Sequence, residues 1–207
     1  KFHAATSVTI ASVVYRPIAE LNGGLRLVQT GELDTLTNFP PERLDYLKSD
    51  MPNTLHLAPS LGLVVYLFNH RLAKFQDPRV REALSISIDR EVLTSKIVRT
   101  GDKPAFGLVP SGLPNYFSAL PAAASNRGAN GPKRARELLA AAGYSATKPL
   151  EVELLYHTSE EHKKIAVVVA SMWQAIGVRT SLRNAERQVA EVAARNGNYE
   201  ITRAAWF

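Results

Sequence analysis

Residues 150–182 read LEVELLYHTSEEHKKIAVVVASMWQAIGVRTSL and contain three elements in immediate succession. Leu150–Tyr156 alternates apolar and acidic side chains, which is typical of a half-buried strand. Glu160–Ile176 has the clearest helical spacing of the chain and is followed by Gly177, and Val178–Leu182 then predicts a second strand. A strand, a helix and a strand in this order indicate an α/β fold, in which helices cover a sheet.

The alternation of strand and helix patterns continues on both sides of this stretch. β-Branched or alternating runs predict further strands at residues 8–14, 33–37, 53–58, 62–68 and 199–203. Apolar residues at helical spacing predict helices at residues 18–30, 40–47, 77–88, 89–101, 132–142 and 185–195. Residues 103–132 lack periodicity and are rich in Pro, Gly, Ser and Asn, which is typical of a long loop. The expected fold class is therefore α/β for the whole chain.

The composition describes a chain that can form a core of its own. Of its 207 residues, 45% are apolar and 21% charged, which excludes global disorder. Because cysteine is absent, thiolate zinc sites, iron–sulfur clusters and cysteine nucleophiles are excluded. The net charge of +6 raises the question of nucleic acid, but the basic segment Lys133–Arg136 has no interleaved aromatic residue and precedes Glu137. We interpret this segment as a solvated helix face and expect no nucleic-acid partner.

Catalytic and metal-binding patterns are weak in this sequence. His157 and His162 stand five residues apart with Glu160 and Glu161 between them. Histidine pairs that bind zinc on a helix stand four apart on one face, and a helix is expected to begin between these two, so we predict no metal site. No nucleophile elbow, phosphate loop or paired carboxylates occur in a suitable context. We therefore expect neither an enzyme nor a cofactor.

The end of the chain carries the side chains best suited to binding a ligand. Arg195 and Arg203 could each hold a carboxylate with two hydrogen bonds, and Trp206 offers a flat wall. The same residues also fit a purely structural interpretation, in which Arg203 is an exposed side chain on an edge strand and Trp206 belongs to the core. The chain stops on Trp206–Phe207 directly after a predicted strand, so we expect it to be a piece of a longer protein.

Several ordered motifs resemble one protein family. They are Asn69, FQDPRVREALSISIDRE at 75–91, a glycine–proline loop at 101–110, ARELLAAAGY at 135–144, LYHTS at 155–159, HKKIA at 162–166 and RAAW at 203–206. From about residue 31 to 206 the chain resembles the oligopeptide- and dipeptide-binding proteins of ABC importers, which are the extracytoplasmic solute-binding proteins of family 5. The last motifs are most similar to the oligopeptide and murein-peptide branch.

The resemblance implies a fold and a set of partners. The fold would be a periplasmic-binding-protein-like lobe, a mixed sheet flanked by helices, and mainly one lobe of a two-lobed protein. Residues 1–30 would enter the lobe as a connecting strand and helix, and residues 31–207 would form the ligand-binding lobe. Such proteins are expected to be periplasmic or extracytoplasmic monomers that hold an extended peptide between two lobes. They deliver it to ABC permease subunits in the membrane, while a separate subunit binds ATP.

The resemblance also implies roles for single residues. Arg203, before Ala-Ala-Trp, matches an arginine that faces peptide carboxylates in relatives, and His162 matches a histidine in the same role. Arg195 corresponds to another such arginine, although its spacing to Arg203 is one residue shorter. Trp206 matches the family tryptophan, and the aspartate that holds the peptide's amino terminus would follow three residues later, after the chain ends. Arg187 stands where relatives often have a tryptophan, so one side-chain pocket is expected to differ.

Some relatives carry a disulfide at the positions of Gly62 and Phe207, and both cysteines are absent here.

Other interpretations of the function stay open at this stage. The same lobe also occurs as the ligand-sensing domain of transcriptional regulators. Within the family, other members bind nickel complexes, haem or sugars, so the ligand does not follow from the motifs alone.

Overall fold

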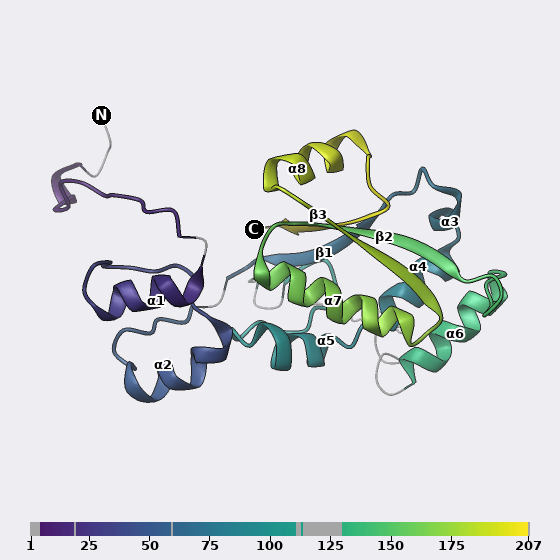
Figure 1. The fold of residues 1–207 in the computed structure, drawn as a ribbon, viewed down its shortest axis with the longest axis horizontal. Coiled ribbons are helices and arrows are strands. Elements are labelled where there is room, and N and C mark those ends of the chain that lie inside the picture. The colour runs from purple at the N-terminus through teal and green to yellow at the C-terminus, as the bar shows by residue number, and fades with distance from the viewer. Residues whose placement is uncertain (1–4, 19, 59, 111–112, 114–129, 207) are drawn as a thin grey trace. The chain divides into compact units, whose positions relative to one another are not determined.

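The computed structural model describes residues 5–18, 20–58, 60–110, 113 and 130–206 (Figure 1). The chain divides into two compact units, residues 1–55 and residues 56–207. The expected division of the chain into a connecting segment, residues 1–30, and a ligand-binding lobe, residues 31–207, stays a prediction.

The first unit is small and helical. Its elements are a 3-10 turn η1 (Ala5–Ser7), α1 (Leu21–Gln29), a 3-10 turn η2 (Pro41–Arg43) and α2 (Leu44–Asp50). The carboxylate of Glu20 caps α1 by accepting hydrogen bonds from the N–H groups of Asn22 and Gly23, at 2.9 and 2.6 Å. Because few of its apolar side chains are buried, chiefly Leu25, Leu44 and Leu47, this unit has only a modest core.

Three strands predicted in this region are wrong. Residues 8–14, 33–37 and 53–58 contain no strand. β-Branched residues favour extended backbone, but a strand also needs a partner for its N–H and C=O groups. Among the described residues no segment pairs with residues 8–14, and Val8, Ile10 and Val14 are exposed.

The second unit is built on a four-stranded mixed sheet. Its strands are β1 (Leu63–Phe68), β2 (Leu150–His157), β3 (Val178–Ala185) and β4 (Ile201–Trp206), in the order β1-β4-β2-β3. β2 runs parallel to both β3 and β4, whereas β1 is antiparallel to β4. The α7 helix connects β2 to its parallel neighbour β3, so the pattern at residues 150–182 is confirmed as a strand–helix–strand unit.

Helices cover both faces of this sheet (Figure 1). They are α3 (Ala73–Gln76), α4 (Pro78–Ile86), α5 (Arg90–Val92), the π-helical segment η3 (Leu93–Val98), α6 (Gly131–Ala141), α7 (Glu160–Gln174) and α8 (Arg187–Asn196). Leu154 belongs to the large core, together with Leu84 of α4 and Trp173 of α7. Leu155, its neighbour in β2, points to the other face and packs against Ala190 of α8. The expected mixed sheet flanked by helices is confirmed.

Local sequence signals set most helix boundaries. Asp77 and Asp89 cap α4 and α5, each accepting a backbone N–H at 2.9 Å. Gly143, Gly177 and Gly197 follow α6, α7 and α8 with φ between 75° and 89°, a left-handed conformation that suits glycine. The helix predicted to reach residue 101 instead ends at Val98, before Arg99 with a φ of 56°. Most of the loop predicted at 103–132 lies outside the described residues.

Asn69 fixes the start of β4 and therefore the position of the residues that follow. Its buried side-chain amide donates to the carbonyls of Gly197 and Tyr199, at 3.0 and 2.9 Å, and accepts the N–H of Arg71 at 3.1 Å. Since these carbonyls lie between the end of α8 and the start of β4, the amide joins that turn to the end of β1. None of the helices in the described ranges is long and apolar enough to span a membrane.

Candidate ligand-binding site

Arg203 is the central residue of the candidate site. It lies in β4, directly opposite Tyr66 of β1. Its side chain is half-buried, and its Nε is buried without a hydrogen-bond partner. Within the described ranges no carboxylate forms an ion pair with it. A buried donor without a partner costs about 1–3 kcal/mol of stability. An anionic ligand that accepts a hydrogen bond from this guanidinium would remove that cost.

Burial shifts the pKa of Arg203 and of its neighbour Tyr66. Desolvation lowers the pKa of Arg203, while the charge of Glu161 and the nearby Tyr66 oppose this effect. The pKa of Tyr66 rises to about 12, mainly because burial disfavours its charged form. At neutral pH the pair is therefore a charged guanidinium beside a neutral phenol.

Two histidines lie at the same end of the sheet. His157 is the last residue of β2, and His162 lies in the first turn of α7. Ser159 caps this helix, since its hydroxyl accepts the N–H of His162 at 3.4 Å. Their rings make an edge-to-face contact with centroids 4.0 Å apart. Burial, followed by the charge of Arg203, lowers the pKa of both histidines, that of His162 to about 4. Both are neutral at pH 7, and Nδ1 of His162 is buried without a partner.

This arrangement suits an anionic ligand. The cluster lies near the carboxyl end of β2, where Leu155 pairs with Thr202 of β4, the residue before Arg203. The α7 and α8 helices lie on opposite faces of this sheet (Figure 1). In open α/β sheets, ligands bind outside the carboxyl ends of the strands where connections leave toward opposite faces. Arg203 offers a planar fork of donors, and the ring N–H of neutral His162 is a further donor, so both side chains can donate to a carboxylate.

Arg195 and Trp206 are not brought into this cluster. Arg195 lies in the last turn of α8, where its side chain is 78% exposed and 3.9 Å from Glu191. Its charge is not among those that shift the pKa of Arg203 or of either histidine. Trp206 is 77% exposed, and strand alternation places it on the opposite face of β4 from Arg203.

Arg187 is the arginine of α8 whose charge reaches the cluster around Arg203. It opens α8, and its charge acts on Arg203 and on both histidines. The sequence analysis noted Arg187 only as a changed pocket wall and assigned no binding role to Tyr66. The available signals for Arg187 were its place near the start of the helix predicted at 185–195 and the tryptophan that relatives often have there. The pairing of strands that brings Arg187 to this edge is not local information.

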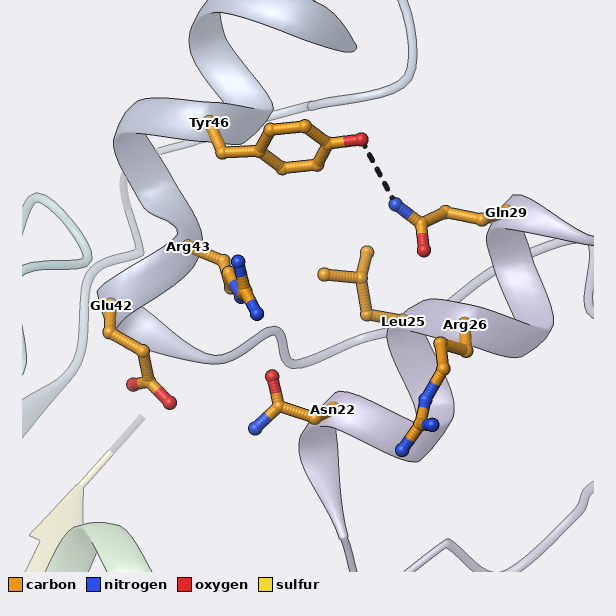
Figure 2. Close-up of a pocket in the computed structure, with 7 residues that line it drawn as sticks. All are labelled: Asn22, Leu25, Arg26, Gln29, Glu42, Arg43 and Tyr46. Atoms are coloured by element: carbon orange, nitrogen blue, oxygen red, sulfur yellow. Dashed lines mark hydrogen bonds between the residues drawn. The ribbon is translucent and has the colours of Figure 1, made fainter.

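A second concave surface lies in the first unit (Figure 2). This cavity of about 740 Å³ is lined by Asn22, Leu25, Arg26, Gln29, Glu42, Arg43 and Tyr46. The amide of Gln29 donates to the hydroxyl of Tyr46 at 3.1 Å and bridges α1 to α2. Leu25 is the buried member of the lining, and the other side chains are polar. No residue of this cavity was singled out from the sequence.

The described residues contain no group of three or more His, Asp or Glu side chains that could hold a metal ion. The rings of His157 and His162 are in edge-to-face contact with each other within the cluster around Arg203.

Comparison with known proteins identifies the family of this chain. Residues 2–207 match the family described as bacterial extracellular solute-binding proteins, family 5 middle. The periplasmic murein peptide-binding protein MppA of Escherichia coli is 36% identical over 204 residues, which is 95% of this chain and 37% of that protein. The periplasmic oligopeptide-binding protein OppA of Salmonella typhimurium is 35% identical over 206 residues, with the same shares covered.

Solved structures agree with this match. The structure of MppA from Escherichia coli has a TM-score of 0.86 at 36% identity and covers 92% of this chain and 38% of its own. The Haemophilus influenzae OppA complex with the peptide RPPGFSPFR has a TM-score of 0.81 at 32% identity, over 90% of this chain and 37% of its own. This chain thus spans less than two fifths of the length of these relatives. It belongs to family 5 of the bacterial extracellular solute-binding proteins.

Proposed function

We propose that this chain is mainly one lobe of the substrate-binding component of a peptide ABC importer. The full protein would hold an extended oligopeptide between two lobes and deliver it to the permease subunits. It would act outside the cytoplasm, as a monomer and without catalysis. The proposal is supported by relatives that are named for binding murein peptides and oligopeptides, and by a similar structure solved with a bound peptide.

One observation carries the assignment of the site. Arg203 is partly buried, keeps an unpartnered Nε and lies in the electrostatic range of a neutral His162. A peptide carboxylate would satisfy Arg203 through charge-assisted hydrogen bonds that are strong in a partly desolvated site. The same carboxylate would raise the pKa of His162, because a nearby negative charge favours the imidazolium.

Arg195 and Trp206 have separate proposed roles. Trp206 would form the wall of a side-chain pocket on the other face of β4, where its ring is largely exposed. Arg195 would contact a carboxylate of longer ligands from the end of α8. We also retain residues 1–30 as the segment that enters the lobe and residues 31–207 as the lobe itself.

The test uses the full-length protein and peptides with either a free or an amidated carboxyl terminus. Arg203→Ala should weaken the free-carboxylate peptides by about 2 kcal/mol or more, which is over tenfold, and should affect the amidated peptides much less. Arg203→Lys should fall between, because it keeps the charge and loses the planar fork. Titration calorimetry gives both affinities.

Arg179→Ala is the matched control. Arg179 is also a strand arginine, but it is exposed at the start of β3 and paired with Glu151 at 3.3 Å. Its loss should leave both affinities unchanged. Equal losses for free and amidated peptides in Arg203→Ala would show that Arg203 does not hold the carboxylate.

A further inference from the structure

Arg187 shares the carboxyl edge of the sheet with the proposed carboxylate site. The last residues of β2 and β3, His157 and Ala185, are paired in register, and the N–H of Thr158 donates to the carbonyl of Ala185 at 2.8 Å. Arg187 follows two residues later. β4, which carries Arg203, lies on the other side of β2. The starts of α7 and α8 and the end of β4 therefore lie at one end of the sheet, as Figure 1 shows.

The guanidinium of Arg187 is accessible and weakly held. Its side chain is 77% exposed, and in the described part of the chain its ion-pair partner is Glu191, one turn further along α8, at 2.9 Å. Glu191 also lies 3.9 Å from Arg195, so it has a second cation to pair with. Exposed pairs of this kind add little stability, so Arg187 can exchange Glu191 for an anion on a ligand.

The two arginines near this edge, Arg203 and Arg187, differ in burial and in ion pairing. Arg203 is partly buried and lacks an ion-pair partner among the described residues, whereas Arg187 is exposed at the rim. The charge of Arg187 acts on Arg203 and on both histidines, which agrees with its place at the same edge. A ligand with one carboxylate on Arg203 would have Arg187 within electrostatic range of a second anionic group.

We propose that Arg187 is a specificity-determining residue that favours peptides with an acidic side chain next to the carboxylate held by Arg203. This inference rests on the proposed function and names a substrate class for the same site. A terminal glutamate presents both groups, a backbone carboxylate and a side-chain carboxylate, on one residue. The neutral amide of glutamine has nearly the same shape and cannot form the second ion pair.

The experiment compares the tripeptides Ala-Ala-Glu and Ala-Ala-Gln on the full-length protein by titration calorimetry at low salt. The unmodified protein should bind the glutamate peptide about two- to fivefold tighter, the gain of one exposed charge pair. Arg187→Gln should abolish this preference while still binding both peptides. Arg179→Gln, which removes an exposed arginine at the start of β3, at the opposite end of the strand from this edge, should keep the preference. Raised salt should reduce it, because mobile ions screen exposed charges.

The outcomes separate this inference from the proposed function. Equal affinities in the unmodified protein, or a preference that survives in Arg187→Gln, would overturn the role of Arg187 while peptide binding through Arg203 stands. Failure of both peptides to bind would overturn the proposed function and this inference with it.

Discussion

Two neighbouring basic side chains at the candidate site, Arg203 and His162, respond differently to the same partly buried environment. Burial lowers the pKa of Arg203, but a guanidinium begins from so high a value that it stays charged. Burial and the charge of Arg203 lower the pKa of His162 to about 4, so this side chain is neutral. Arg203 is thus a permanent charge next to an uncharged group that can hydrogen-bond, and this pair suits the one carboxylate that Arg203 would hold.

His162 should make the stability of the protein depend on pH. Its pKa is about 4 when folded and near 6.5 when unfolded, so the unfolded chain binds the extra proton between these values. The stabilisation is complete above pH 6.5 and is lost as the pH falls toward 4. The lowered pKa of His157 acts in the same direction.

The measurement is urea unfolding of the full-length protein at pH 7.5 and pH 5. His162→Gln should reduce the loss of stability between the two pH values by about 1 kcal/mol, a figure discounted for water screening of a half-exposed ring. A variant that keeps the entire acid-dependent loss would contradict the assignment of this titration to His162.

At the level of elements, the sequence predicted those helices, strands and helix ends that depend on residues close together in the chain. The strand–helix–strand unit at 150–182, the aspartate caps of α4 and α5 and the glycines after three helices all follow from local patterns. Strand pairing is not local, which is why residues 8–14 were wrongly predicted as a strand. Arg203 was singled out first by the chemistry of its side chain and then by the family resemblance, and the role of His162 came from the resemblance alone. The place of Arg187 required the pairing of β2 with β3.

The contact between α4 and α6 gives a test at this scale. Gly131, the first residue of α6, is buried, and a Cβ at this position would lie 2.6 Å from the carbonyl oxygen of Ile86 in α4. Gly131→Ala should therefore destabilise the full-length protein by about 1–2 kcal/mol, even though alanine favours helices. Urea unfolding monitored by circular dichroism measures this change. Lys133→Ala, an exposed change in the same helix, should stay within about 0.5 kcal/mol, and an unchanged midpoint for Gly131→Ala would refute the clash.

At the scale of the whole molecule, the two compact units differ in how well each supports its own fold. Residues 56–207 contain the large core around Trp173, Phe75 and Leu154, with a sheet covered on both faces. Residues 1–55 bury few apolar side chains and expose Val13, Val14 and Tyr15. A unit of this size with so small a core gains little stability from burial. We therefore attribute the folding of this chain in isolation to residues 56–207.

The isolated chain should fold but bind peptides poorly. Hydrogen exchange should show strong protection in β2, β4 and α7, because they lie in the large core, and weak protection in residues 5–18. Peptide affinity should be about 100-fold or more below that of the full-length protein, because one lobe offers fewer contacts to offset the entropy lost on binding. Water also keeps access to Arg203 when no second lobe closes over it, which weakens its pairing with a carboxylate. Titration of tri- and tetrapeptides into both proteins measures the difference, after exchange has shown that the chain is folded. Micromolar binding to the isolated chain would show that this lobe alone forms a complete site.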